Sequence, residues 1–133
     1  MNTPYKVLVV EDDENLGRIM AETLMAAGYE VQTADDGLHG LMMYLEQQPE
    51  VVLTDIQMPE LDGLEMMRCI RAINPNVKTI YVSGAVSQYR EALRSEGKEY
   101  GAIVLNKPFA RNDLLQSMNG WRSDRLESST QAD

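Results

Sequence analysis

Short apolar runs alternate along the chain with segments whose apolar residues recur at helical spacing. The first run, Lys6–Val10, is rich in β-branched residues, as are strands buried in a parallel sheet. Four further runs predict strands at Tyr29–Thr33, Val51–Thr54, Val77–Val82 and Ala102–Leu105. Five strands alternating with five helices predict an α/β domain whose strands pair in parallel through right-handed crossovers.

The helices are predicted from apolar residues spaced three or four positions apart. The clearest stripes are Leu16, Ile19, Met20, Thr23, Leu24 and Ala27; Leu38, Leu41, Met42 and Leu45; and Leu64, Met67, Ile70 and Ile73. A weaker stripe of Val86, Tyr89 and Leu93 predicts a helix from about Val86 to Glu96, and Leu114, Leu115 and Met118 predict the last one. Methionines near these stripes, including Met42, are expected to fill the core, and Cys69 to be a core or boundary residue.

The length of 133 residues and the apolar fraction of 44% fit one domain with one packed core. We expect this domain to span residues 4–121. The residues after Trp121 are polar and rich in Ser, Arg and Glu, so residues 122–133 are predicted to be a disordered tail or a linker.

The net charge of −9, from 21 acidic and 12 basic residues, argues against nucleic-acid binding and against an anionic membrane surface. Cys69 is the single cysteine, which excludes an internal disulfide and favours a reducing compartment. The chain starts without the build of a signal peptide, and no apolar run approaches the roughly 20 residues of a membrane span. A cytoplasmic protein is therefore expected.

Polar residues whose side chains can bind a metal ion or take part in a reaction follow four of the predicted strands. They are Glu11 and Asp12, Asp55, Ser83, and Lys107. Because ligands of open parallel sheets bind beyond the carboxyl ends of the strands, these side chains are expected to share one site.

Carboxylates about 5 Å apart repel by roughly 3 kcal/mol per pair at an effective dielectric near 20, so such a cluster either raises pKa values or holds a cation. All-oxygen ligation by few carboxylates suits Mg²⁺. The acidic run Glu11–Glu14 also has a plainer interpretation, an acidic first turn that complements the helix dipole. That interpretation is favoured for Asp13 and Glu14, and the metal for Asp12.

Asp55 is the candidate nucleophile for phosphoryl transfer, in which a cation offsets the repulsion between two anions. Lys107 would hold one phosphoryl oxygen and Ser83 would donate a hydrogen bond to another. In isolation Asp55 would be interpreted as a loop or helix cap. The other polar residues expected at the same edge of the sheet favour the role of nucleophile instead.

These segments resemble the receiver domains of bacterial response regulators over nearly the whole chain, from about Tyr5 to Met118. The matching motifs are Val9-Val10-Glu11-Asp12-Asp13, Leu53-Thr54-Asp55-Ile56-Gln57-Met58-Pro59 with Asp62-Gly63, Val82-Ser83-Gly84 and Lys107-Pro108-Phe109. The resemblance implies a flavodoxin-like, doubly wound three-layer sandwich with strand order 2-1-3-4-5.

The resemblance also implies roles for the site residues. Asp55 would be the phosphoacceptor. Asp12 and Asp55 would ligate Mg²⁺ (or Mn²⁺) directly, Glu11 would act through a water, and the backbone carbonyl of Gln57 would complete the protein ligands.

By the same resemblance, Ser83 holds the hydroxyl position and Lys107 the lysine position, with a cis Lys107–Pro108 bond. One position departs from the pattern: many receivers carry Tyr or Phe three residues before the lysine, where this chain has Val104. The usual coupling of the hydroxyl to an aromatic rotamer cannot operate here as it does in those proteins.

The implied function is two-component signalling or a phosphorelay. A histidine kinase or phosphotransfer protein would phosphorylate Asp55, and a conformational switch would signal to a downstream protein without catalytic turnover, apart from autodephosphorylation. Alternatives are a fragment of a longer regulator with an output domain, a scaffold without phosphotransfer, and an aspartate phosphatase of the haloacid dehalogenase type. That phosphatase normally needs a second acid where Gln57 stands. Phosphorylation-linked homodimerisation has no dedicated signature and stays open.

Overall fold

A parallel five-stranded sheet forms the centre of the molecule. The structure is a computed structural model that describes residues 5–131, with side chains as far as Trp121. The sheet has the strand order β2-β1-β3-β4-β5, which confirms the expected doubly wound topology. Its strands are β1 (Lys6–Val10), β2 (Glu30–Ala34), β3 (Val51–Asp55), β4 (Lys78–Ser83) and β5 (Ile103–Asn106).

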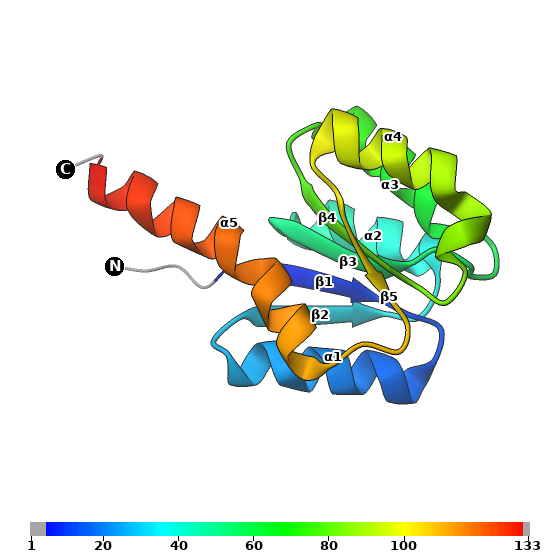
Figure 1. Cartoon of the computed structure of the whole chain (residues 1–133), viewed down its shortest axis with the longest axis horizontal. Helices are drawn as coiled ribbons and strands as arrows, with labels where there is room; N and C mark the ends of the chain where they lie inside the picture. The colour runs from blue at the N-terminus through cyan, green and yellow to red at the C-terminus, as the bar shows by residue number, and fades with distance from the viewer. Residues whose placement is uncertain (1–4, 132–133) are drawn as a thin grey trace.

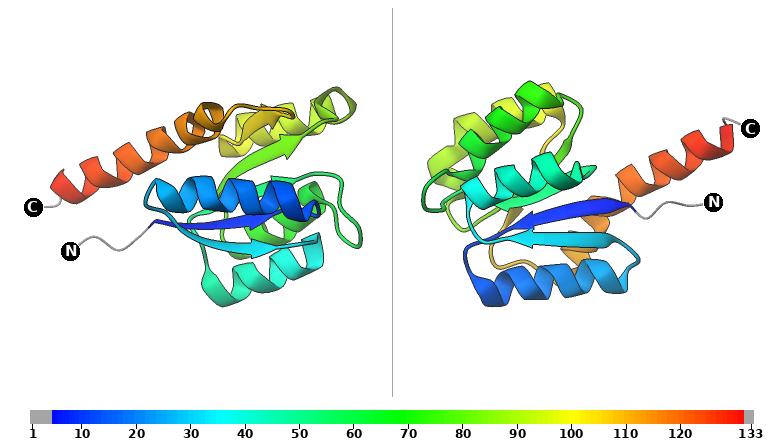
Figure 2. Two further views of the ribbon diagram at one scale, coloured as in Figure 1. Left: turned by 90° about the horizontal axis from the view of Figure 1, so that it is seen from below. Right: turned by 180° about the vertical axis from the view of Figure 1, so that it is seen from behind.

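Helices cover both faces of the sheet and complete a three-layer sandwich (Figures 1 and 2). They are α1 (Glu14–Ala26), α2 (Gly37–Gln47), α3 (Gly63–Ile73), α4 (Arg90–Tyr100) and α5 (Arg111–Gln131), with a 3₁₀ turn, η1 (Val86–Tyr89), before α4. Helices α1 and α5 lie on one face, and α2, α3 and α4 lie on the other.

Alternation along the strands supplies a core to each face, because successive side chains of a strand point to opposite sides. In β1, Val7 and Val9 pack toward α1 and α5, whereas Leu8 and Val10 pack toward α2 and α3. Both sets are buried. A strand covered on both sides is therefore apolar throughout, which is why these runs are recognisable in the sequence.

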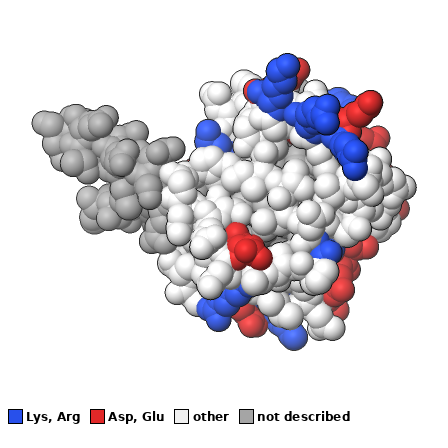
Figure 3. Space-filling view, viewed as in Figure 1, with Lys and Arg blue, Asp and Glu red and all other residues white. Residues whose placement is uncertain are grey.

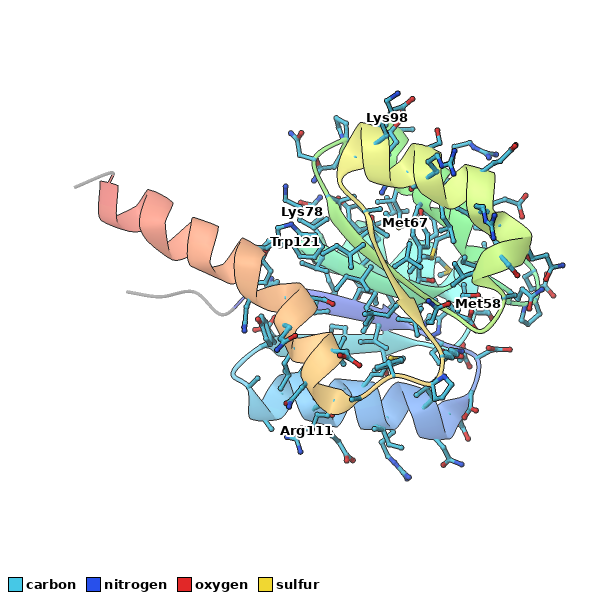
Figure 4. The ribbon with its side chains drawn as sticks, in the orientation of Figure 1. Met58, Met67, Lys78, Lys98, Arg111 and Trp121 are labelled. Atoms are coloured by element: carbon cyan, nitrogen blue, oxygen red, sulfur yellow. The ribbon has the colours of Figure 1, made fainter. Side chains whose placement is uncertain are left out.

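All five strands run in the same direction, so their carboxyl ends meet at one edge of the sheet. Asp55 and Ser83 are the last residues of β3 and β4. Figure 4 shows Met58, in the loop that follows β3, at this edge, and Trp121 of α5 at the opposite end of the sheet. The polar residues singled out in the sequence are thereby brought to one side of the fold.

Helix α2 is rotated relative to the expected apolar stripe. The side chains of Leu38, Met42 and Leu45 are 50%, 62% and 53% exposed, so the prediction that Met42 fills the core is wrong. The buried face instead contains Gly40 and Tyr44. A Cβ atom on Gly40 would lie 2.9 Å from Val10 Cγ2, so the missing side chain lets the helix backbone approach the sheet and turns the larger residues outward.

The region after β4 also differs from the prediction. The single helix expected from Val86 to about Glu96 is a 3₁₀ turn followed by α4, and within α4 only Leu93 is buried. Cys69 lies on the outer side of α3 and is exposed rather than part of the core. In α4 the apolar stripe was too weak in the sequence to fix which side of the helix faces inward. In α3 the stripe is clear, and Cys69 is not one of its positions.

Helix α5 continues to Gln131, beyond the last apolar residue that predicted it (Figure 1). The side chains after Trp121 and residues 132–133 lie outside the described part of the chain, so the proposed tail or linker at 122–133 stays a prediction. Among the described residues, no helix is both long enough and apolar enough to cross a membrane.

The turn after β3 makes a stability prediction. A Cβ atom at Gly63 would lie 2.1 Å from the backbone oxygen of Asp55. We expect Gly63→Ala to lower the free energy of unfolding by about 1–3 kcal/mol, because backbone must move to admit the methyl group. Gly120→Ala is the matched control: its Cβ would have no neighbour within 4 Å, and a helical alanine should add about 0.5–1 kcal/mol. Urea unfolding measures both; equal effects of the two substitutions would contradict the prediction.

Candidate functional site

Three carboxylates meet at the carboxyl edge of the sheet. Asp55 ends β3, and Glu11 and Asp12 follow β1. One oxygen from each lies within 4.8 Å of the others. Glu11 and Asp55 are buried and Asp12 is exposed, so the group is open to solvent on one side only.

The start of α1 fixes the two acidic residues after β1. Asp13 is the N-cap residue, and its side chain accepts hydrogen bonds from the N–H groups of Asn15 and Leu16. Glu11 Oε2 in turn accepts the N–H of Asp13 at 3.2 Å. Asp13 therefore caps the helix, while Glu11 and Asp12 point to the site.

Lys107 joins the carboxylates from the end of β5. Its Nζ atom lies 2.9 Å from Glu11 Oε1 and 3.0 Å from Asp55 Oδ2. The Lys107–Pro108 peptide bond is cis, and the backbone N–H of Lys107 donates to the Ser83 carbonyl at 2.9 Å. Three segments far apart in the sequence thus share one ammonium group.

The electrostatics follow from burial and from this crowding. Burial raises the pKa of Glu11 to about 7, and the nearby charge of Asp55 adds to the shift, although the hydrogen bonds from Lys107 and Asp13 oppose it. Burial alone would lower the pKa of the Lys107 ammonium, but its hydrogen bonds to Glu11 and Asp55 hold that pKa above its usual value. Lys107 therefore stays charged, while Glu11 titrates near neutral pH.

The Asp55 carboxylate is held in one orientation. Its Oδ1 accepts the N–H of Ile56 at 2.7 Å and its Oδ2 accepts from Lys107. Ile56 is fixed in turn, because its carbonyl accepts the N–H of Gly63 at 2.8 Å. Both carboxylate oxygens of Asp55 therefore accept a hydrogen bond, and the group lies close to Glu11 and Asp12.

The remaining predicted site residues lie around this centre. Ser83 is buried at the end of β4, and its Oγ accepts the N–H of Ala85 at 3.0 Å. Gln57 is exposed in the loop after β3, with its Nε2 atom 3.5 Å from Gln88 Oε1. Val104 is half-buried in β5 and pairs in register with Tyr81 of β4.

Sequence reasoning missed a buried polar group beneath α4, formed by Arg71, Tyr81 and Glu96. Its signals were present but weak. Arg71 interrupts the inner side of an apolar stripe, and Tyr81 carries a hydroxyl into an otherwise aliphatic part of a central strand.

Comparison with known proteins identifies the class to which this fold and site belong. The model of the response regulator receiver domain matches residues 7–119. The chain therefore belongs to the response regulator receiver domain family, as its motifs predicted.

Relatives of known description agree. The chain is 33% identical to the response regulator receiver protein CpdR of Brucella abortus, over 85% of this chain and 92% of CpdR. It is 32% identical to the response regulator MprA of Mycobacterium sp., covering 86% of this chain but only 49% of MprA. The chain thus spans about half the length of several relatives that it matches.

Solved structures share the fold. A CheY-like receiver domain protein from Methanospirillum hungatei superposes with a TM-score of 0.83 at 25% identity, over 95% of this chain and 99% of that one. The receiver domain of the sensor histidine kinase PA1611 from Pseudomonas aeruginosa gives 0.78 at 28% identity, over 90% and 98%, and contains magnesium in its active-site cleft. Two-component receiver function follows for this chain; receivers bind Mg²⁺, interact with histidine kinases or phosphotransfer proteins, and typically signal rather than turn over substrate.

The carboxylate cluster yields a prediction about pH. Glu11 holds a proton below its pKa of about 7, and a cation that needs all three carboxylates charged must displace it. The apparent Mg²⁺ affinity at pH 6 is expected to be about tenfold weaker than at pH 8. Without Mg²⁺ the raised pKa of Glu11 makes the folded protein more stable at low pH, where Glu11 is protonated. This contribution to the free energy of unfolding is lost as the pH rises through about 7.

Thermal melts with and without Mg²⁺ at the two pH values measure this effect. At 100 times its dissociation constant the ion should add about 2.7 kcal/mol. Asp12→Ala removes the exposed carboxylate of the cluster and should abolish the gain at both pH values. A gain independent of pH would contradict the linkage between ion binding and the Glu11 proton, and a gain retained in Asp12→Ala would show that the ion binds elsewhere.

Proposed function

We propose that Asp55 accepts a phosphoryl group from a phosphohistidine of a kinase or phosphotransfer protein. The observation that supports this most directly is the position of Lys107 Nζ, 3.0 Å from Asp55 Oδ2 on a carboxylate that is otherwise buried. A lysine held there by two carboxylates provides fixed positive charge beside the oxygen that would be modified.

The reaction forms one bond and breaks one. A carboxylate oxygen of Asp55 attacks phosphorus, the phosphorus–nitrogen bond of the donor breaks, and the leaving imidazole keeps its electron pair and takes up a proton. The N–H of Ile56 and the ammonium of Lys107 orient the attacking group. Lys107 then pairs with a phosphoryl oxygen, and Ser83 donates its hydroxyl proton to another.

The donor set fits a small hard cation. Asp12 and Asp55 would hold Mg²⁺ or Mn²⁺ directly, Glu11 through a water, and the backbone carbonyl of Gln57 would be a further ligand. When bound, such an ion offsets the charge of the carboxylates and of the incoming phosphoryl group. The proximity of the three carboxylates supports this assignment, because one oxygen from each lies within 4.8 Å of the others.

The phosphorylated domain would act through contact with a downstream protein in the cytoplasm. Relatives such as MprA are about twice as long as the stretch matched here, so an output domain in a longer regulator is the alternative route for the signal. Neither route requires this domain itself to bind nucleic acid, consistent with its net charge of −9.

Intact mass spectrometry after incubation with acetyl phosphate and Mg²⁺ tests the proposal. We expect the mass of one phosphoryl group to be added, and to be absent from Asp55→Asn, which preserves the size of the side chain but not its nucleophile. Lys107→Met should slow the gain, because the positive charge beside Asp55 Oδ2 is lost.

Asp35→Asn is a matched control, since Asp35 is an acid outside the cluster that pairs with His39 on the surface. It should be modified like the wild type. Modification of Asp55→Asn, or no modification of the wild type by any donor, would refute the assignment.

A further inference from the structure

Three hydroxyl side chains line one face of β4. Thr79, Tyr81 and Ser83 alternate along the strand and therefore point to the same side, toward α3 and α4. All three are buried. Each is hydrogen-bonded to a different part of the structure on that side, so β4 is connected by polar contacts along its whole buried face.

Two of these hydroxyls meet a buried ion pair. Arg71 of α3 donates through Nη2 to Thr79 Oγ1 at 2.8 Å and through Nη1 to Glu96 Oε1 of α4. The Tyr81 hydroxyl donates to the same oxygen of Glu96. The Arg71 side chain is only 5% exposed, and the ring of Tyr100 covers its guanidinium with the centroid 4.0 Å from Cζ. These residues form the Arg71–Glu96 cluster.

Apart from the Arg71–Glu96 cluster, helix α4 makes few buried contacts with the rest of the molecule. Leu93 is its single buried residue, and Gly97 in its interior lowers helix stability relative to alanine. Its outer surface is charged, because Arg90, Arg94 and Lys98 are exposed. Figure 3 shows Lys and Arg side chains along the top of the molecule, where Figure 1 places α4. A helix with so small an apolar anchor depends on polar contacts for its position. The Arg71–Glu96 cluster supplies them.

The third hydroxyl connects this arrangement to the phosphorylation site. Ser83 ends β4 one residue after Val82, which pairs in register with Asp55. Its Oγ accepts the N–H of Ala85, in the short loop that leads directly into η1 and α4. Rotation of the Ser83 side chain toward a phosphoryl oxygen on Asp55 would carry Oγ away from the Ala85 N–H, and the loop that leads into η1 and α4 would lose this contact.

Position 104 gives no alternative route through an aromatic ring. Val104 lies beside Tyr81 across the β4–β5 pair, so the aromatic side chain of this layer is on β4 instead of β5. Burial and the hydrogen bond to Glu96 raise the pKa of the Tyr81 hydroxyl, which therefore remains a proton donor throughout the physiological range.

We propose that phosphorylation at Asp55 is read out through β4: capture of the phosphoryl group by Ser83 shifts the strand and breaks the contact of Tyr81 with Glu96, which releases α4 from its present position. The inference rests on the proposed function of Asp55. It assigns to Tyr81, Glu96 and Arg71 the positioning role that an aromatic residue on β5 would otherwise have.

Hydrogen–deuterium exchange of α4 tests this, with acetyl phosphate and Mg²⁺ maintained in the buffer and the intact mass recorded on the same samples. In the wild type, phosphorylation should speed exchange of the Arg90–Tyr100 amides by at least about tenfold, the loss expected for one hydrogen bond to a charged group. Tyr81→Phe and Glu96→Gln should show the faster exchange without phosphate and no further change with it.

Glu91→Gln is the control, because Glu91 lies on the exposed side of α4 and undergoes the same chemical change as Glu96. It should respond like the wild type. A phosphorylated wild type whose α4 exchange is unchanged would overturn the readout but leave the chemistry at Asp55 intact. A phosphorylation response in Tyr81→Phe and Glu96→Gln equal to that of the wild type would do the same. Absence of any mass gain would overturn the proposed function and the readout together.

Discussion

The position of one ammonium group between two buried carboxylates is the constraint on which the site depends. Lys107 Nζ lies 2.9 Å from Glu11 and 3.0 Å from Asp55, although the three residues come from the ends of β5, β1 and β3. Two carboxylates at this separation repel by roughly 3 kcal/mol at an effective dielectric near 20. The lysine offsets this repulsion, but burial still raises the pKa of Glu11, with a smaller contribution from the charge of Asp55. The site is therefore prepared for additional positive charge.

The parallel sheet that brings these site residues together also connects the site with helix α4, through strand β4. Residues on alternate positions of β4 face either the α1–α5 layer or the α3–α4 layer, and the second set consists of Thr79, Tyr81 and Ser83. A hydroxyl that contacts the site and two that contact a neighbouring ion pair thus belong to one rigid strand. In such an arrangement a small displacement at the strand end acts on a helix whose apolar anchor is a single leucine.

Local sequence could predict the elements and their order of appearance but not the packing of each helix. The strands were recognisable because burial on both faces makes them apolar throughout. The observed strands β2, β4 and β5 begin one residue after their predicted first residues, and β1 and β3 begin at the predicted residue. For α2, the prominent apolar residues Leu38, Met42 and Leu45 indicated the wrong face. Close approach of the backbone at Gly40 decides that orientation, and it depends on Val10 and Met66, which no periodicity in α2 reveals.

The alternating α/β architecture, and the acids, hydroxyl and lysine that follow the strands, could be predicted from the sequence alone. Both predictions depend on short-range patterns of apolar residues and on turn residues. The sequence also indicated, through Val104, that an aromatic on β5 is missing. The packing of the whole fold is what places Lys107 between Glu11 and Asp55, raises the pKa of Glu11 by burial, and brings Arg71 and Glu96 together beneath α4. These properties arise from distances and burial among residues far apart in the chain, and such distances exist only once the sheet and its helices have packed.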